Sequence, residues 1–400
     1  MKASFFDILK SIAANPQIVL ARPGVNTFLV RYMQKFTPQK VGGKVVLHSH
    51  LPPLNSIAYK RFVDEHLLQQ NHKPSHAQIG ITNVCKQNCA YCYNKGRSGT
   101  PMDTTTIIET GKKLIDMGVF WLGFTGGEPL MNPDLVRITK NLGDRCSLKC
   151  FSTGMDLTPK LAAELRDAGL FYFSISLDHY QEKVHDTIRG YRGAYRAALQ
   201  AIEILKKLEN VHVSVSAVFN RSMFENQDLI RFIRFIENLD IHELWLSESK
   251  PATASLCRDE SIITPEQRQS MVQFQDQYNK KARMTLNYLN HFEGKESFGC
   301  NAGHKMVYVD AYGETSPCVF IPMTFGNVKT QPVEQIVSTM QACFPSEDCC
   351  FINKNYRTLA ELDQALPLGP QQSIDVLKRI PFGPYGSFFK AFYGKAKARQ

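Results

Sequence analysis

Six short runs of β-branched and aromatic residues alternate with amphipathic stretches between residues 76 and 290. The predicted strands are 77–82, 120–125, 147–153, 171–177, 211–219 and 242–249. Apolar residues at helical spacing lie between several of them, and predict helices at 104–118, 158–169, 196–209 and 229–239. This alternation predicts an α/β fold with a parallel sheet and crossover helices. Six units favour a partial (βα)6 TIM-like barrel, because a closed eightfold barrel takes about 250 residues.

The regions on either side of this core break the alternation. Residues 1–75 are predicted to be mostly helical with extended loops, and residues 291–351 form a small Cys-rich extension. Residues 352–400 carry helices and end in an aromatic and basic tail. Together with the α/β domain at 76–290, these regions divide the chain of 400 residues into four predicted parts. A chain of this length can bury a sizeable hydrophobic core.

Charge and cysteine content narrow the function classes. The net charge of +10 would suit an anionic partner, but the basic residues are dispersed and no RNA-binding module is recognised, so no nucleic-acid partner is expected. Asp7 and Lys10 interrupt the first apolar run, which argues against an export signal, and no stretch is long enough to span a membrane. We therefore expect a reducing, cytoplasmic location, where eleven cysteines favour metal or cluster binding over disulfides. Cys146, Cys150 and Cys257 are expected to remain thiols.

Three cysteines, Cys85, Cys89 and Cys92, share one short loop after the first predicted strand. Thiolates suit zinc and iron–sulfur clusters alike. A structural zinc site would need a fourth ligand, and none lies in this loop. A cluster held by three cysteines leaves one iron free for a small molecule, at the face of a barrel where catalysis occurs.

The pattern CxxxCxYC in this loop resembles the signature of the radical S-adenosylmethionine (radical SAM) superfamily. The resemblance implies that Cys85, Cys89 and Cys92 bind a [4Fe-4S] cluster whose free iron is chelated by SAM, and that Tyr91 lies near the adenine. It also implies that a donor such as flavodoxin or ferredoxin delivers an electron. SAM is then cleaved to methionine and a 5'-deoxyadenosyl radical, which abstracts hydrogen from a substrate.

Further motifs at strand ends resemble SAM contacts of the same family. Gly126, Gly127 and Glu128 resemble the GGE motif that contacts the SAM ammonium group; the glycines also permit close backbone approach. Without the resemblance, this stretch would be an ordinary turn. The resemblance also implies that the ribose and methionine parts of SAM are bound by Ser152, Thr153, Ser176 and Asp178. Arg189 would bind the SAM carboxylate. Without the resemblance, Arg189 would be a solvated residue beside a helix.

The stretch from Cys300 to Cys318, with Gly313 before the second cysteine, resembles the opening hairpin of SPASM and twitch extensions. The resemblance implies an auxiliary [4Fe-4S] cluster, and the cysteine spacing favours the shorter twitch form with one cluster. A zinc site is the alternative. The ligands expected are Cys300, Cys318 and Cys343, with Cys349 or Cys350 as the fourth.

The sequence leaves the substrate open. The resemblance favours a peptide, a protein side chain or a small molecule; a lipid or isoprenoid is the alternative, because the termini are apolar and the chain is basic. The aromatic and basic segment 380–400 could touch an anionic membrane, dock an acidic peptide, or pack on the barrel. A different class, a non-catalytic iron–sulfur or zinc scaffold or electron carrier, would need no SAM pocket.

Overall fold

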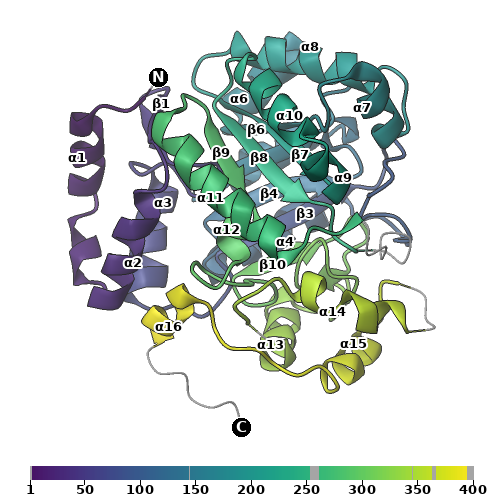
Figure 1. Ribbon diagram of the computed structural model, residues 1–400. Coiled ribbons are helices and arrows are strands. Elements are labelled where there is room, and N and C mark those ends of the chain that lie inside the picture. The colour runs from purple at the N-terminus through teal and green to yellow at the C-terminus, as the bar shows by residue number, and fades with distance from the viewer. Residues whose placement is uncertain (1, 144, 253–260, 345, 363–365, 394–400) are drawn as a thin grey trace.

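One sheet runs through the molecule in the order β11-β10-β3-β4-β5-β6-β7-β8-β9 (Figure 1). The computed structural model describes residues 2–143, 145–252, 261–344, 346–362 and 366–393. The central strands β3 to β8 are parallel to their neighbours, which confirms the predicted partial barrel. Their bounds are β3 His76–Thr82, β4 Trp121–Gly126, β5 Ser147–Ser152, β6 Tyr172–Ser176, β7 His212–Phe219 and β8 Glu243–Glu248.

Helices between these strands follow the apolar spacing. Strands of this sheet are buried over nearly their whole length, as is usual when both faces of a parallel sheet are covered. Asp103 caps the first of these helices through the Thr106 N–H, and Thr158 caps α6 in the same way. The helices are α4 Thr104–Met117, η3 Pro129–Met131, α5 Leu135–Leu142, α6 Pro159–Asp167, α7 Glu182–Arg189, α8 Ala194–Lys206, α9 Arg221–Glu225, α10 Asp228–Glu237 and α11 Pro265–Lys281.

The sheet is wider than the sequence predicts. β9 (Thr285–Tyr288) pairs in parallel with β8, and β10 (Met306–Val309) pairs in parallel with β3 on the other side. The Cys-rich extension therefore joins the sheet of the core through β10, and β11 (Thr315–Ser316) closes that edge. The other elements of the C-terminal part are α12 Asn290–Glu293, α13 Val333–Cys343, α14 Phe351–Ala360, α15 Pro370–Leu377 and α16 Ser387–Tyr393.

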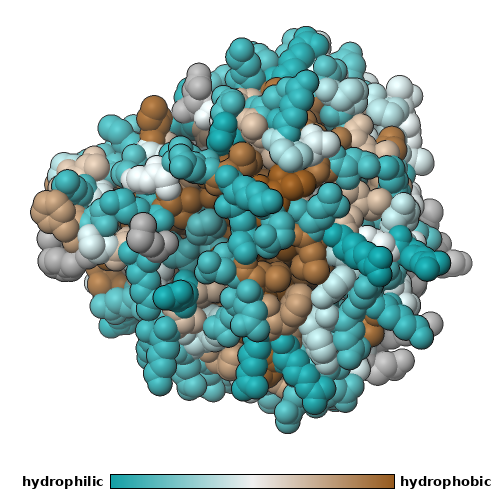
Figure 2. All heavy atoms as spheres, turned by 90° about the horizontal axis from the view of Figure 1, so that it is seen from above, coloured by the Kyte–Doolittle hydropathy of each residue, from teal (hydrophilic) through white to brown (hydrophobic). Residues whose placement is uncertain are grey.

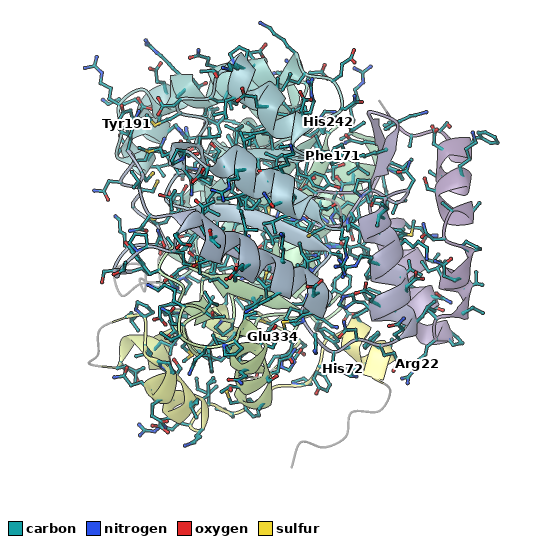
Figure 3. The ribbon with its side chains drawn as sticks, turned by 180° about the vertical axis from the view of Figure 1, so that it is seen from behind. Arg22, His72, Phe171, Tyr191, His242 and Glu334 are labelled. Atoms are coloured by element: carbon teal, nitrogen blue, oxygen red, sulfur yellow. The ribbon has the colours of Figure 1, made fainter. Side chains whose placement is uncertain are left out.

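The N-terminal part and the last helix pack together (Figure 1). Phe388, Phe389 and Phe392 of α16 are buried, and Arg22 donates to Phe392 O at 2.8 Å; Figure 3 shows Arg22 and His72 beside this helix. The N-terminal elements are α1 Phe5–Ala13, η1 Pro16–Leu20, α2 Pro23–Met33, β1 Gln39–Val41, β2 Lys44–Val46, α3 Ile57–Arg61 and η2 Phe62–Leu68.

Membrane contact through the termini stays a prediction. Phe388, Phe389 and Phe392 of α16 are buried inside the molecule. The basic tail after Tyr393 lies outside the described residues, and so does Cys257. Phe6, Val19 and Leu20 are exposed. On the face in Figure 2, hydrophilic residues cover most of the surface and apolar ones come through between them. In the described part of the chain, no helix has the length and apolar character needed to cross a bilayer.

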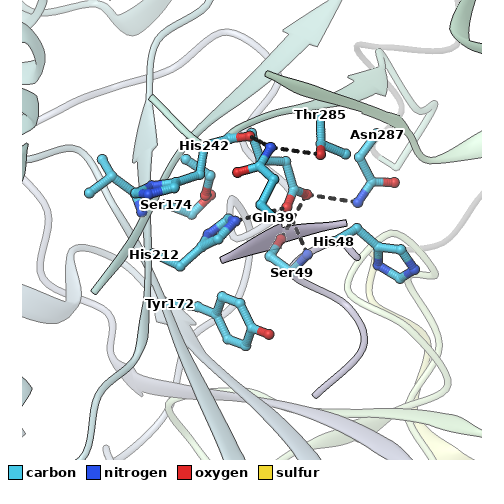
Figure 4. A network of polar contacts seen from close by, with 12 residues as sticks. Gln39, His48, Ser49, Tyr172, Ser174, His212, His242, Thr285 and Asn287 are labelled. Carbon is cyan, nitrogen blue, oxygen red and sulfur yellow. Dashed lines mark hydrogen bonds and ion pairs between the residues drawn. The ribbon is translucent and has the colours of Figure 1, made fainter. Parts of the chain in front are cut away.

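A loop after β2 closes the amino-terminal end of the barrel (Figure 4). The buried carboxylate of Glu243, at the start of β8, accepts from Ser49 N at 2.7 Å, Ser49 Oγ at 2.8 Å and Asn287 Nδ2 at 2.7 Å. Lys149 Nζ also donates to Ser49 Oγ, and Trp121 Nε1 donates to Ser49 O. This loop therefore fills the amino-terminal end of the barrel around Glu243, and a catalytic site is expected at the carboxyl ends of the strands.

Candidate active site

The cysteine loop after β3 is held by backbone hydrogen bonds on both sides. Gly127 N donates to Thr82 O at 2.7 Å, which ties the start of the loop to the end of β4. Asn88 N donates to Arg189 O at 3.0 Å, which ties its middle to the end of α7. The loop therefore has two fixed neighbours, and both carry residues that the sequence predicts as SAM contacts.

Two glycines at the end of β4 allow this close approach. Gly126 has φ +120°, and a Cβ there would lie 2.2 Å from Thr82 O. A Cβ on Gly127 would lie 2.2 Å from Val84 O. Because real Cβ atoms do not approach a carbonyl oxygen so closely, any side chain at Gly127 would push the cysteine loop away.

We expect Gly127→Ala to lower the iron bound at this loop to less than half of the wild-type amount. The added methyl group displaces Val84, which directly precedes Cys85. Iron per chain after anaerobic reconstitution checks this. The matched control is Gly369→Ala, whose Cβ would meet only Gln372 at an ordinary 3.4 Å, and equal iron in both variants would contradict the prediction.

A cavity of about 400 Å³ lies at the carboxyl ends of the strands, within the usual size range of ligand sites. It brings together almost all of the predicted cofactor contacts: Cys85, Cys89, Tyr91, Cys92, Gly126, Gly127, Glu128, Ser152, Thr153, Ser176 and Arg189. Its wall also includes residues that the sequence analysis missed, at the ends of β7 and β8: Ser216, Val218, Ser247, Glu248 and Lys250. The rule of polar residues at strand ends, applied to the last two strands as well, would have found these.

Glu128 is fixed by its neighbours. Its carboxylate accepts from Ser152 Oγ at 2.7 Å, Thr153 N at 2.6 Å and Leu130 N at 3.0 Å. Burial raises the pKa of Glu128, while the hydrogen bond donors around it lower the pKa. The carboxylate thereby joins the ends of β4 and β5 at one point on the cavity wall.

Asp178 lies behind the cavity wall instead of facing a ribose, in contrast to the expectation from the sequence. Its fully buried carboxylate pairs with Arg189 Nε at 2.7 Å and accepts from Tyr91 Oη at 2.6 Å and Val218 N at 2.9 Å. The Arg189 guanidinium lies 5.5 Å from the centre of the Tyr91 ring, and its Nη1 is 3.8 Å from Cys89 Sγ. Asp178 thus positions Tyr91 and Arg189, which themselves line the cavity.

Burial favours the protonated thiol at two of the loop cysteines, Cys85 and Cys89. Burial raises the pKa of Cys85 to about 11, and raises the pKa of Cys89 although Arg189 opposes this. Thiolate is the form that binds iron, so binding must release protons. Within the described residues, no three His, Cys, Asp or Glu side chains are grouped as ligands of a single metal ion.

Three of the five C-terminal cysteines meet at a second cavity of about 180 Å³, which we call the inner cavity. Cys300, Cys318 and Cys350 line it, and burial raises the pKa of both Cys318 and Cys350 to about 12. Cys343 lies elsewhere, at the end of α13, where its thiol donates to a backbone carbonyl of the same helix, and Cys349 is exposed. The structure therefore favours Cys350 over Cys349 as a ligand, and does not place Cys343 with the other three.

A buried ionic network joins the two cavities. Lys250 Nζ lies 3.0 Å from Glu248 Oε1, 2.7 Å from Glu293 Oε2 and 3.3 Å from Cys350 Sγ. Arg268 pairs with Glu248 at 2.9 Å from the outer side. Glu248 and Lys250 face the larger cavity, whereas Glu293 and Cys350 face the inner one.

Lys305 is buried beside the inner cavity, and burial lowers its pKa from 10.5 to about 7. Between these values the unfolded chain binds more protons than the folded chain, so stability should rise with pH. We expect wild type to gain on the order of 4 kcal/mol of unfolding free energy relative to Lys305→Met as the pH rises from about 7 to about 10. Urea denaturation of both proteins across this range checks it; a difference that does not change with pH would contradict it.

The side chains that line the two cavities fit the cofactors that the sequence predicts, which are SAM and iron–sulfur clusters. Soft thiol ligands in groups of three suit iron–sulfur clusters. The larger cavity combines those thiols with hydroxyl groups, a carboxylate and a guanidinium, which can bind the sugar and amino acid parts of a nucleotide-like cofactor. A partial barrel with such a loop after its first strand defines a class of enzymes that perform radical chemistry with SAM.

Comparison with known proteins supports this class of enzyme. The family model for the radical SAM superfamily matches residues 79–233, and the model for the SPASM iron–sulfur cluster-binding domain matches residues 300–358. The chain belongs to the radical SAM superfamily and carries a SPASM domain. The predicted family and the prediction of an enzyme are thus confirmed, and these domains imply SAM and iron–sulfur clusters; the number of clusters stays a prediction.

Curated relatives have different activities. AdoMet-dependent heme synthase of Methanosarcina barkeri is 26% identical over 280 residues, 64% of this chain and 80% of that protein. The subtilosin biosynthesis protein AlbA of Bacillus subtilis is 25% identical over 278 residues, 66% of this chain and 60% of that protein. PqqA peptide cyclase of Bradyrhizobium diazoefficiens is 31% identical over 158 residues, 38% of this chain and 41% of that protein.

Solved structures share the fold. Streptococcus suis SuiB bound to the precursor peptide SuiA superposes with a TM-score of 0.55 at 13% identity, covering 74% of this chain and 76% of that one. The protein anSMEcpe with bound AdoMet and a Cp18Cys peptide gives a TM-score of 0.54 at 15% identity, covering 80% and 97%. At these identities the likeness shows the fold alone.

Proposed function

We propose that this radical SAM enzyme abstracts a hydrogen atom from a peptide or protein side chain, with Cys85, Cys89 and Cys92 as ligands of the SAM-binding cluster. The observation that carries the proposal is the single cavity that these thiols share with Glu128, Ser176 and Arg189 at the carboxyl ends of the strands. A scaffold or electron carrier would not need that set of polar groups around its thiols.

The cavity residues have distinct proposed roles. Glu128 is oriented by Ser152 and Thr153 to receive the SAM ammonium group, and Arg189 is oriented by Asp178 to receive the SAM carboxylate. Hydroxyl groups along the strand ends, including Ser176 and Ser216, are available for the ribose. Glu128 and Arg189 are held by protein contacts before the cofactor binds, so these two groups need little reorganisation.

When bound, the cluster and SAM supply a 5'-deoxyadenosyl radical that abstracts hydrogen. The protein must keep water and other hydrogen donors away from it. Val319 and Phe320, from the SPASM domain, and Trp245, from β8, line the cavity and supply apolar cover. We propose that a small reductase partner such as flavodoxin or ferredoxin delivers the electron, and that Cys300, Cys318 and Cys350 hold an auxiliary cluster.

A peptide substrate is supported by the relatives. AlbA is named for biosynthesis of the bacteriocin subtilosin, a second relative is named PqqA peptide cyclase, and SuiB has been solved with its precursor peptide. A small molecule is the second candidate, because two curated relatives are heme synthases.

The test is SAM cleavage by the reconstituted protein. With dithionite and SAM under anaerobic conditions, we expect 5'-deoxyadenosine and methionine in equal amounts, measured by liquid chromatography with mass detection. Addition of a peptide encoded beside the gene should give a product with a changed mass and deuterium transfer into 5'-deoxyadenosine from labelled peptide. Absence of 5'-deoxyadenosine from a protein that holds its full iron would overturn the proposal.

A further inference from the structure

The first helices of the chain, α1 and α2, form one edge of the molecule (Figure 1). They lie outside both matched domains, which cover residues 79–233 and 300–358. One face of α2 is used inside the molecule, where Val25 and Leu29 join a local core with residues of α16. The other face of this N-terminal part is turned to solvent, so it is a surface that the two matched domains do not supply.

Exposed apolar side chains are concentrated in this part of the chain. Among the described residues, eight large apolar side chains are exposed, and five of them come from the first 57 residues. These five are Phe6, Val19, Leu20, Val30 and Ile57. Val19 and Leu20 have the largest exposed fractions, 71% and 75%. Single exposed apolar residues are normal on a protein surface, but such a concentration in one region indicates an interaction surface.

The exposed pair Val19 and Leu20 is held in place by α2. Asn26 Nδ2 donates to Val19 O at 3.2 Å and to Ala21 O at 3.1 Å, which fixes η1 beside the start of α2. Val30 lies one helical turn further along α2 than Asn26. A fixed backbone on two neighbouring elements therefore presents these three apolar side chains to solvent.

The same part of the chain carries most of the net positive charge. The first 60 residues contain eight lysines and arginines but a single acidic residue, within a chain whose net charge is +10. Among the described residues, no carboxylate pairs with Lys10 or Arg31. Lys10 Nζ lies 4.6 Å from the centre of the Phe6 ring, and Arg31 directly follows Val30. Unpaired cations therefore lie next to exposed apolar side chains.

This combination of charge and apolar surface favours a lipid partner. The exposed apolar residues come from separate elements and line neither of the two cavities, so they do not shape a pocket for one defined ligand. The headgroup region of a bilayer accepts single apolar side chains, and anionic lipids attract the cations beside them. A second copy of this chain would bring the same positive charge to the contact, which opposes pairing.

We propose that this chain docks on an anionic membrane surface through α1, η1 and α2. The exposed apolar side chains of these elements enter the headgroup region, and Lys10 and Arg31 contact lipid phosphate groups. The contact is peripheral, because no helix in the described part of the chain is long and apolar enough to cross a bilayer. This goes beyond the proposed function, since neither SAM cleavage nor a peptide substrate requires a membrane.

Sedimentation of the reconstituted full-length protein with lipid vesicles tests this. One set of vesicles is pure phosphatidylcholine, and the other contains equal parts of phosphatidylcholine and phosphatidylglycerol. We expect at least tenfold tighter binding to the anionic vesicles, and loss of most of it as NaCl rises from about 50 to about 500 mM, because salt screens the charges. Equal binding to both sets, or no binding to the anionic set at about 1 mM lipid, would overturn the proposal.

Two double variants locate the contact on the N-terminal part. Val19→Ser with Leu20→Ser removes exposed apolar surface without a change of charge, and should weaken binding to the anionic vesicles at least tenfold. Lys10→Gln with Arg31→Gln removes two cations and should weaken this binding about threefold to tenfold. Because all four side chains are exposed, we expect both proteins to fold as the wild type does, which circular dichroism checks. Wild-type affinity in both double variants would overturn the proposal.

Lys160→Gln with Arg196→Gln is the matched control for the loss of two cations. These side chains are 87% and 79% exposed on the barrel helices α6 and α8, outside the N-terminal part. The control makes the same change of net charge and should leave the affinity within about twofold of the wild type. An equal loss of affinity in the control and in Lys10→Gln with Arg31→Gln would show that only net charge matters, and would overturn the proposal.

The same proteins distinguish the other possible occupants of this surface. Polyglutamate that binds as tightly as the anionic vesicles, and more weakly to both N-terminal double variants, would indicate an acidic protein partner. A dimer in gel filtration that dissociates in Val19→Ser with Leu20→Ser would indicate a second copy of this chain. Either result would overturn the assignment of the surface to a membrane.

Discussion

Replacing Cys85, Cys89 and Cys92 together by alanine should reduce 5'-deoxyadenosine formation to the level of a sample without protein. Among the described residues, these thiols are the cysteines that line the larger cavity, so no other cysteine described there can replace them. We also expect the variant to lose about four irons per chain while keeping the iron held by the C-terminal cysteines. Iron analysis and chromatography of the same anaerobic samples measure both effects.

Cys146→Ala is the matched control for this experiment. Cys146 is buried in the core and lines neither cavity, so iron content and SAM cleavage should stay at the wild-type level. Should the triple variant keep its full iron, or still cleave SAM, the assignment of the three ligands would be wrong.

Lys250→Met should lower the free energy of unfolding by about 3–5 kcal/mol, because it removes the cation shared by the buried Glu248 and the partly buried Glu293. Lys250 is 3% exposed, and Glu248 and Glu293 both pair with it. In this variant Arg268 still pairs with Glu248, so the loss of the Lys250 cation destabilises Glu293 more than Glu248. Urea denaturation of the protein without its clusters measures the change.

Lys60→Met is the matched control for that comparison. Lys60 also pairs with a carboxylate, Asp64, but on the surface, where such a pair is worth less than about 1 kcal/mol. A loss of stability in Lys250→Met no larger than that in Lys60→Met would contradict the buried network.

Much of the barrel could be predicted, because its strands are continuous apolar runs and its helices repeat their apolar residues at regular spacing. β3 to β8 lie where these patterns predict them, to within a residue or so. β9 was missed. The predicted hairpin of residues 300–318 contains β10, but its pairing with the core sheet was not predicted. Each of these two strands has four residues, too few for a clear pattern, and each joins the sheet only by pairing with a core strand.

Some residues of the candidate site could likewise be predicted from the sequence, and others could not. Cys85, Cys89 and Cys92 lie close in sequence, so their grouping was visible without a structure. The contact between Lys250 and Cys350 joins residues 100 positions apart, and spacing between cysteines could not distinguish Cys350 from Cys343. Asp178 stands at a predicted strand end, but only the fold shows that it turns toward Arg189.

By itself, the sequence determined the class of fold, the family and the loop of three cysteines, because these depend on local patterns of a few neighbouring residues. The tertiary structure alone decided which distant cysteines meet, which charges are buried together and that the N-terminal part and α16 enclose the inner cavity. The physical reason is that burial and pairing depend on how separate elements pack, and no local pattern records which elements will face each other.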